Sequence, residues 1–317
     1  MTAKVRIGIQ TGQDGQEWAD LLDFWRFVDT ETVFDSVWTI DHYVPPTPGQ
    51  DPNGPCLEGW TTLAAGAQAT ERLRLGCLVT GVTYRHPSVL AKMAATVDHI
   101  SNGRLEFGLG AAWHEMEHRV YGIPFHTLKE RSDRLEEATE LIRLLFDADG
   151  PVDFEGTHYQ LKQAPFSPRC VQQPHPPIII GGGGEKRTLR TAARFADGIN
   201  VIGSVDVAKH KIEVLERHCA DVGRDPAEIT KSVFGPLFLT DDEQRAEQMR
   251  KAMAPGMAGG DEESAARGLA IGNAEHIRGV LERFAEVGVS SFIMMSRPPY
   301  KQELYKQISE EIAVPFS

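Results

Sequence analysis

The sequence predicts an α/β protein with a (β/α)8 TIM barrel, in which eight parallel strands alternate with eight helices around one axis. Strand-like and helix-like segments alternate along almost the whole chain of 317 residues. Polar and glycine-rich clusters follow directly after several strand-like segments, as at the active-site end of such barrels. We therefore expect a single domain over residues 1–317, with insertions at about 151–177 and 241–270. A doubly wound open sheet is the structural alternative.

Four strand–helix pairs are predicted in the first half of the chain. Short apolar and β-branched runs predict the strands, and the helical spacing of apolar residues such as Trp18, Leu21 and Trp25 predicts the helices. A proline opens the third helix, and the turn sequence DADG ends the fourth. The predicted strands are residues 5–10, 36–40, 73–79 and 104–109. The predicted helices are residues 17–30, 57–70, 87–100 and 128–146.

The second half resumes this alternation after an interruption. Residues 151–177 carry six prolines, and the sequence FEGTHYQL within them predicts a small hairpin. Residues 241–269 are polar with PGMAGG at their centre, which predicts a helix plus a mobile loop. The predicted strands are residues 178–180, 198–202, 230–239 and 290–295. The predicted helices are residues 185–195, 205–222 and 273–287.

Composition excludes several classes of protein. The net charge of −12 argues against nucleic acid as a partner, because neutralising phosphates needs clustered Lys and Arg. No run approaches the ~18 apolar residues of a membrane span, and MTAKVRIGIQ lacks the apolar core of a signal peptide. Four dispersed cysteines without a C-x-x-C pair are typical of free thiols in a reducing compartment. We expect a cytoplasmic protein without a membrane or nucleic-acid partner.

The unusual residues cluster after the predicted strands, at the end of a barrel where active sites lie. Each cluster alone has a simple structural explanation, such as a cap, a helix start or a tight turn. Their agreement over five loops predicts a functional site. The clusters are Asp41 and His42, residues 80–86, residues 110–115, Gly181 to Gly184, and Arg297.

The four glycines at 181–184 lie between a predicted strand and a predicted helix. Consecutive glycines in this place can expose several backbone N–H groups toward one anion, and the helix dipole adds to the attraction. The sequence therefore indicates a phosphate site, with a simple tight turn as the alternative.

The sequence HEMEH at 114–118 fits the H-E-x-x-H pattern of zinc proteases. In those enzymes both histidines lie on one helix, with a third ligand further along the chain. Here the motif begins four residues after the glycine-rich end of a strand, GLG, so at most its second half is helical. No H-x-x-G-x-x-H continuation follows. A zinc hydrolase is therefore a minor alternative, and we expect no metal.

Four stretches together resemble the luciferase-like monooxygenase superfamily, and within it the branch that uses the 8-hydroxy-5-deazaflavin coenzyme F420. The resemblance extends from about residue 5 to 202, with a weaker similarity in GNAEHIRGVLERFAEVGVSSFIMM. The stretches are DHY, LEGWTTLAA, RLRLGCLVTGVTYRHPSVLAKMAATVDHISNGRLEFGLGAAWHEMEH and PPIIIGGGGEKRTLRTAARFADGIN.

The resemblance implies a barrel whose flavin-like ring lies over the C-terminal mouth. It also implies a non-proline cis peptide behind the ring, which falls by position at Leu78–Val79. His114 would bond the cofactor chain, and the glycines with Glu185 would hold its phosphate. The residues that the resemblance assigns to the cofactor are Asp41, His42, Leu78, Val79, Thr80, Gly81, Ala111, Ala112, His114, Gly181, Gly182, Gly183, Gly184 and Glu185.

One position departs from part of the branch. Some F420-dependent sugar-phosphate dehydrogenases carry a glutamate proton donor where this chain has Ala111. The resemblance then leaves His42 as the acid/base candidate, because an imidazole with an ordinary pKa of about 6.5 exchanges protons near neutrality. Asp41 would orient or charge it.

The function that the resemblance implies is hydride transfer between F420 and an unidentified small organic substrate. An FMN-dependent monooxygenase using reduced flavin and O₂ is the alternative, and a non-catalytic cofactor-binding protein is a further one. A homodimer is expected because members of the superfamily are commonly dimers. The insertion at 241–270 is a candidate lid. Candidates for lining the substrate pocket are Trp113, Tyr84, Tyr43, Phe238 and Arg297, although the aromatic ones could equally pack in the core or in loops.

Overall fold

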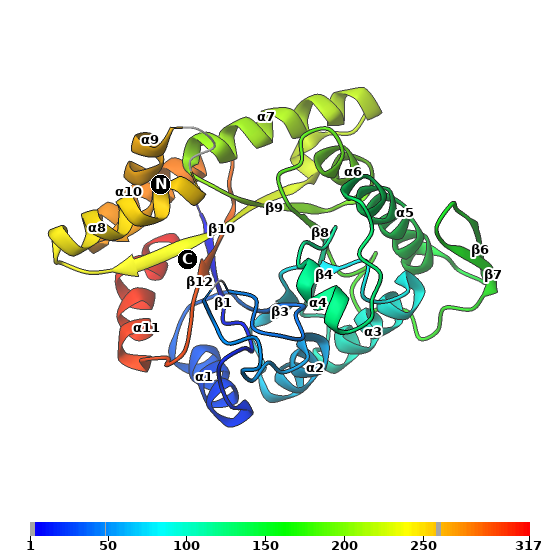
Figure 1. Ribbon diagram of the computed structural model, residues 1–317, viewed down its shortest axis with the longest axis horizontal. Coiled ribbons are helices and arrows are strands. Elements are labelled where there is room, and N and C mark those ends of the chain that lie inside the picture. Colours follow the sequence, from blue (N-terminus) through cyan, green and yellow to red (C-terminus); the bar gives the residue numbers. More distant parts are fainter. Residues whose placement is uncertain (1–3, 48, 258–260) are drawn as a thin grey trace.

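The computed structural model describes residues 4–47, 49–257 and 261–317. Eight parallel strands form a closed barrel in the order β1-β2-β3-β5-β8-β9-β10-β12, and β12 pairs with β1 to close it (Figure 1). This confirms the predicted (β/α)8 fold. The barrel strands are β1 (Arg6–Gln10), β2 (Ser36–Thr39), β3 (Arg74–Cys77), β5 (Leu105–Gly110), β8 (Ile178–Gly181), β9 (Gly198–Ile202), β10 (Thr230–Leu239) and β12 (Ser291–Met295).

Helices surround the strands because each has one apolar face (Figure 1). In the first helix, for example, Leu21, Phe24, Trp25 and Val28 are buried at the spacing of one helix face. The surrounding helices are α1 (Trp18–Glu31), α2 (Gly59–Ala69), α3 (Pro87–Ile100), α5 (Leu128–Asp147), α6 (Thr188–Phe195), α7 (Val205–Val222), α10 (Ala274–Glu286) and α11 (Gln302–Ile308). A π-helical turn, Ser309–Ala313, and a 3₁₀ turn, Val314–Phe316, follow α11; no element was predicted for residues 301–317.

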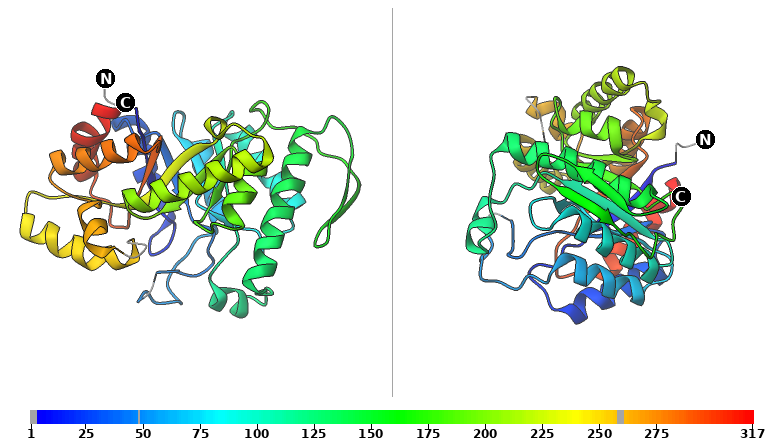
Figure 2. Two further views of the ribbon diagram at one scale, coloured as in Figure 1. Left: turned by 90° about the horizontal axis from the view of Figure 1, so that it is seen from above. Right: turned by 90° about the vertical axis from the view of Figure 1, so that its right-hand side faces the viewer.

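The first insertion contains the predicted hairpin. Strands β6 (Val152–Glu155) and β7 (Gln160–Ala164) pair antiparallel and project beside α5, away from the barrel (Figures 1 and 2). The Glu137 carboxylate of α5 accepts the N–H groups of Thr157, His158 and Tyr159, which fixes the hairpin turn to the body of the protein.

The second insertion is more regular than expected. It contains the predicted helix, α8 (Glu243–Met253), and also a 3₁₀ turn, Ala254–Gly256, and a second helix, α9 (Glu262–Arg267). Strand β11 (Ala270–Gly272) then pairs with β10. The predicted mobile loop falls in part on residues 258–260, which lie outside the described residues.

Two element boundaries differ from the prediction at positions that matter for the site. The third strand, predicted as 73–79, ends at Cys77; Leu78–Val79 is a cis peptide, and β4 (Thr80–Gly81) then pairs with β5. The helix predicted from residue 185 begins at Thr188, so a three-residue turn separates the glycines from α6. The location of the cis peptide at Leu78–Val79 is as expected.

The interior of the barrel is filled by its own cluster of side chains. Trp38, Leu78, Ile179 and Ile293 pack there, with Val79 and Phe234 at the edge of the cluster. A Cβ atom at Gly76 would lie 2.2 Å from the Trp38 ring, so only glycine admits this indole between the strands. Along the described part of the chain no helix is both long and apolar enough to cross a membrane.

Candidate active site at the mouth of the barrel

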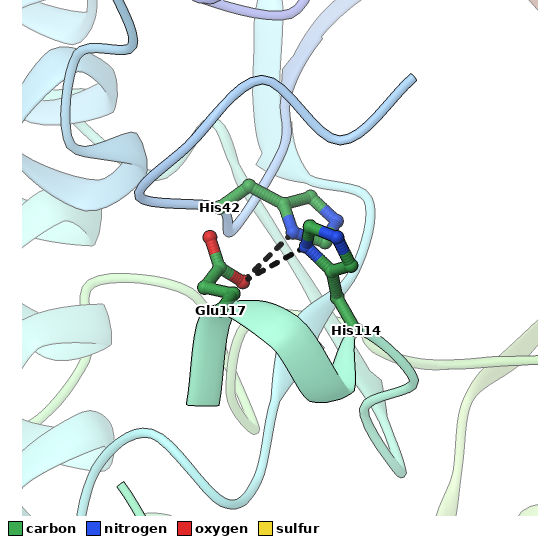
Figure 3. A group of neighbouring side chains, drawn as sticks. All are labelled: His42, His114 and Glu117. Carbon is green, nitrogen blue, oxygen red and sulfur yellow. Dashed lines mark hydrogen bonds and ion pairs between the residues drawn. The ribbon is translucent and has the colours of Figure 1, made fainter. Parts of the chain in front are cut away.

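The carboxyl ends of the strands converge at one mouth, and three polar side chains meet there. His42 follows β2, His114 follows β5, and Glu117 lies on the short helix α4 (Glu115–Val120). Figure 3 shows the two imidazole rings facing the same carboxylate. One ligand-type atom from each side chain lies within 4.8 Å of the others.

Glu117 is the centre of this group, and its side chain is fully buried. One oxygen, Oε1, accepts the backbone N–H groups of Tyr43 and Val44, the latter at 3.1 Å. The other oxygen, Oε2, accepts the Tyr84 hydroxyl and lies 3.0 Å from Nδ1 of His42. These four contacts match the approximately four acceptor sites of an ionised carboxylate.

The hydrogen bonds keep Glu117 ionised in spite of its burial. Burial raises the pKa of Glu117, but hydrogen bonds from His42, Tyr84 and the Tyr43 N–H outweigh it and lower that pKa to about 2. Burial and the hydrogen bond to Glu117 raise the pKa of Tyr84, so the phenol keeps its proton and donates. At neutral pH the site therefore holds an ionised Glu117 and a neutral Tyr84 that donates to it.

His114 caps the start of α4 beside this carboxylate. Its Nδ1 is buried without a hydrogen-bond partner in the described structure and lies 3.8 Å from Oε2 of Glu117. Burial lowers the pKa of His114, an effect that the charge of Glu117 only partly opposes. The centre of the His114 ring lies 5.5 Å from the centre of the His42 ring and 4.9 Å from that of the Trp113 ring. His114 is therefore neutral at pH 7 and fills the wall of the site.

The HEMEH motif does not form the zinc site of a protease. Only its second histidine, His118, is inside α4, and the Nε2 of this ring lies 2.7 Å from the Thr83 hydroxyl. Its Nδ1 lies 2.8 Å from the carbonyl oxygen of His114, so the two imidazoles of the motif do not face a common point. The three groups that do converge include Glu117, whose acceptor positions are already filled; a cation there would have to displace the hydrogen bond from His42.

Asp41 directly precedes His42 in the sequence. Its side chain is buried, but it forms no hydrogen bond with His42. Its Oδ2 accepts the Gly81 N–H at 3.1 Å and Nη1 of Arg85 at 2.8 Å. Arg85 also bonds Glu58 at 2.6 Å. Burial raises the pKa of Asp41, although Arg85 opposes the shift. The carboxylate that contacts His42 is therefore Glu117 and not Asp41, which corrects the orienting role expected for Asp41.

Residues 78–81 form one wall of the mouth. The Leu78 carbonyl accepts Nε2 of Gln10 at 3.2 Å. Next to it, Val79 packs on two glycines at the ends of β5 and β8: a Cβ atom at Gly110 or at Gly181 would lie 2.6 Å from a Val79 methyl group. These glycines therefore admit the Val79 side chain over the strand ends.

Thr80, Ala111 and Ala112 complete this part of the mouth. The Thr80 hydroxyl accepts Nε1 of Trp60 at 2.9 Å. Ala112 has a φ of 60°, a left-handed conformation that turns the chain out of β5. A Cβ atom at Gly81 would lie 3.2 Å from the Ala112 methyl group, so the ends of β4 and β5 are in close contact here.

The glycine turn after β8 presents free backbone donors. The N–H of Gly182 bonds the Asn200 carbonyl at 3.0 Å, but those of Gly183, Gly184 and Glu185 donate to no acceptor among the described residues. Lys211 of α7 lies beside the turn, since a Cβ atom at Gly183 would be 3.3 Å from its Cε. Unpaired backbone donors next to a lysine are features of an anion site.

Glu185, expected to hold a phosphate, has an acidic side chain that turns toward α7. Its carboxylate bonds Nζ of Lys211 at 2.6 Å and Nε2 of His210 at 3.0 Å, and it is exposed. Only its backbone N–H suits an anion. Lys211 was not predicted from the sequence, because nothing in the sequence of α7 indicates that this residue reaches the turn after β8.

The expected pocket residues divide into two groups. Trp113 lies 5.4 Å from the His42 ring and is 61% exposed, and Tyr43 lies 5.1 Å from Tyr84. These three belong to the site. Phe238 instead packs in the cluster under α8, and Arg297 bonds Thr47 at 2.8 Å and Asp14 at 3.5 Å.

Comparison with known proteins agrees with this architecture. The family model described as luciferase-like monooxygenase matches residues 1–307, and the chain belongs to this family. The chain is 36% identical over 169 residues to an F420-dependent glucose-6-phosphate dehydrogenase of Amycolatopsis mediterranei, a match that covers 53% of this chain and 49% of that protein. It is 29% identical to the 5,10-methylenetetrahydromethanopterin reductase of Methanopyrus kandleri, over 71% of this chain and 64% of the relative.

The solved structures extend the likeness over the whole fold. That of an F420-dependent secondary alcohol dehydrogenase in complex with an F420–acetone adduct matches with a TM-score of 0.81 at 21% identity, and covers 98% of this chain and 99% of that chain. At 21% identity, this structural similarity establishes the fold alone. In sequence, the chain spans about half the length of the curated relatives it matches first.

Proposed function

We propose that this protein is an F420-dependent oxidoreductase that moves a hydride between the deazaflavin and a small organic substrate. The observation that carries the proposal is the state of His42. Its Nδ1 is held by a buried carboxylate, whereas its Nε2 bonds no described residue and is not among the buried unpaired atoms. Such a ring can exchange a proton through Nε2 with a molecule in the mouth. The F420 dependence named in two of the relatives above supports the choice of cofactor.

The residues at the mouth fit such a cofactor in two respects. Free N–H groups at residues 183–185 suit a phosphate, and Lys211, whose ammonium bonds the Glu185 carboxylate, lies beside them as a second contact once it leaves Glu185. Asp41 Oδ1 is buried without a partner in the described structure, which suits a donor on the ring system. F420, when bound, gives or takes a hydride at C5 while the protein binds and orients it. We propose as its binding residues Asp41, His42, Leu78, Val79, Thr80, Gly81, Ala111, Ala112, His114, Gly181, Gly182, Gly183, Gly184 and the backbone of Glu185.

The remaining groups have separate tasks in this proposal. His42 exchanges the proton that accompanies hydride transfer. Trp113, Tyr43 and Tyr84 limit water at the reacting position by their apolar rings. Helices α8 and α9 of the second insertion serve as a cover for the substrate. We propose further that residues 1–317 act as one domain, and that the protein works as a cytoplasmic homodimer; its four cysteines are free, as a reducing compartment requires.

Titration of the purified protein with F420 and with FMN tests the choice of cofactor. We expect saturable fluorescence quenching of F420 and weak or no binding of FMN. Submicromolar affinity for FMN without affinity for F420 would overturn the proposal in favour of a flavin monooxygenase, the second candidate that the family's description supports. Oxygen uptake with reduced FMN would then be expected. Light scattering of the same sample tests the dimer.

A further inference from the structure

We propose that Glu117 is the positioning residue that fixes the tautomer of His42, with the proton on Nδ1 and the lone pair on Nε2. His42 is thereby preset to accept a proton, and the substrate it suits is an alcohol that becomes a carbonyl compound. The inference rests on the proposed function only for the hydride acceptor. The tautomer itself follows from the contacts around Glu117 (Figure 3).

The hydrogen-bond partners of Glu117 leave one arrangement for this proton. An ionised carboxylate only accepts hydrogen bonds. Two of its partners are backbone N–H groups, of Tyr43 and Val44, and the third is the Tyr84 hydroxyl. The fourth is Nδ1 of His42 at 3.0 Å, which must therefore carry a hydrogen. In a neutral imidazole the other nitrogen, Nε2, is then the acceptor.

The carboxylate is held so that it cannot turn away from His42. Its side chain is fully buried, and both of its oxygens are engaged by groups from two other segments of the chain. The two backbone donors directly follow His42 in the sequence, so one carboxylate fixes both the loop and the ring that the loop carries. The other imidazole, His114, is 3.8 Å away and does not compete at hydrogen-bond distance.

The chemistry balances with the groups named. An alcohol loses its C–H bond, whose electron pair and hydrogen pass as hydride to the deazaflavin, and its O–H proton passes to Nε2 of His42. The C–O bond becomes C=O. The imidazolium that forms still donates through Nδ1 to Glu117, and the opposite charges stabilise it in this partly dry site. In the reverse direction the imidazolium returns the same proton.

Glu117→Gln tests the tautomer with almost no change of shape. The glutamine carbonyl must take the place of Oε1, because the N–H groups of Tyr43 and Val44 would otherwise face another donor. Its NH₂ group then faces His42 and donates to Nδ1, which moves the ring proton to Nε2. We expect ¹⁵N NMR, recorded over a pH series up to the alkaline plateau of the His42 signals, to show a protonated Nδ1 in the wild type and a protonated Nε2 in the variant. Loss of the signal in His42→Gln assigns it.

Controls separate this role from a structural one. Glu115→Gln changes an exposed glutamate of the same helix and should leave the His42 spectrum unchanged. Glu115→Gln and Glu117→Gln should both bind F420 as the wild type does. In Glu117→Gln we expect kcat for isopropanol oxidation to fall roughly 10²–10⁴-fold with little change in KM. Glu117→Asp, which restores the charge, should recover part of kcat.

Each outcome decides one part of the proposal. A wild-type His42 protonated on Nε2, or stoichiometric metal in the purified protein, overturns the tautomer whatever the cofactor is. An inverted tautomer in Glu117→Gln confirms it even if the protein fails to bind F420, a failure that would overturn the proposed function instead. If Glu117→Gln does not fold, the wild-type spectrum alone decides. Tight F420 binding with no oxidation of a series of primary and secondary alcohols would overturn the substrate class.

Discussion

Glu117 is, at the scale of single residues, the group on which the site depends. It is a buried anion whose charge is balanced by hydrogen-bond donors, and no Lys or Arg within the described ranges forms an ion pair with it. Such an anion is stable only while its donors stay in place, because an unpaired buried charge is costly. The loop at Tyr43 and Val44, the Tyr84 hydroxyl and the His42 ring are thus energetically coupled through the Glu117 carboxylate.

The same carboxylate predicts part of the acid sensitivity of the protein. The pKa of Glu117 is about 2 in the folded state and about 4.3 in an unfolded chain. A lowered pKa stabilises the fold above the unfolded value, and this contribution is lost as the pH falls from about 5 to 2. We expect Glu117→Gln to flatten the fall in free energy of unfolding between pH 5 and 3, measured by urea unfolding. An unchanged slope would show that Glu117 is not ionised in the folded protein.

His42 predicts a second change at this scale. His42→Gln removes the only proposed proton carrier, so kcat should fall roughly 10²–10⁴-fold, whereas the affinity for F420 should fall far less because the other proposed cofactor contacts remain. Steady-state kinetics and cofactor titration measure the two quantities separately. A normal kcat would assign proton transfer to another group.

Lys211 gives a prediction for cofactor binding. Lys211→Ala should weaken F420 about 5- to 30-fold, since a charge-assisted bond to a phosphate contributes about 1–2 kcal/mol. Lys209→Ala removes an exposed lysine from the same helix and serves as the matched control. Equal affinities of the two variants would exclude the glycine turn as the phosphate site.

The individual residues were predicted unevenly from the sequence. Asp41, His42 and Gly181 to Gly184 lie at the mouth because they stand at or just beyond the ends of β2 and β8. Glu117 lies within HEMEH, but the H-E-x-x-H pattern assigns no role to this position and gave no indication of its partner, His42. That partner lies 75 positions away, and a local motif carries no information about such a distant contact.

At the scale of elements, the side chain of Val79, which directly precedes β4, packs on Gly110 at the end of β5 and on Gly181 at the end of β8. Gly110→Ala should therefore destabilise the protein by roughly 1–3 kcal/mol, because its methyl group would collide with Val79. The double variant Gly110→Ala/Val79→Ala should recover part of this loss, and urea unfolding measures both. Strictly additive losses would show that the two residues do not interact.

Element types were predictable where apolar periodicity is strong, as in α1 and α5. The break of the third strand at residues 78–79 was placed by family resemblance, since composition does not reveal it. Strand β11 and helix α9 were not predicted, because a three-residue strand and a six-residue helix carry too little periodic signal.

At the scale of the whole molecule, the fold was predictable because the β/α alternation repeats around the barrel and because polar residues follow the strands. Closure between β12 and β1, which excludes the open-sheet alternative, joins the two ends of the chain and needs no specific motif. The barrel brings His42, Glu117 and the glycine turn to one mouth from three distant segments. What the sequence leaves open is the substrate, since pocket shape depends on many distant side chains together.

Parallel titration of the purified protein with F420 and FMN decides whether this mouth serves hydride transfer with a deazaflavin. We expect saturable binding of F420 and weak or no binding of FMN, with F420 affinity reduced in Lys211→Ala and retained in Lys209→Ala. Submicromolar binding of FMN with no binding of F420 would contradict this expectation.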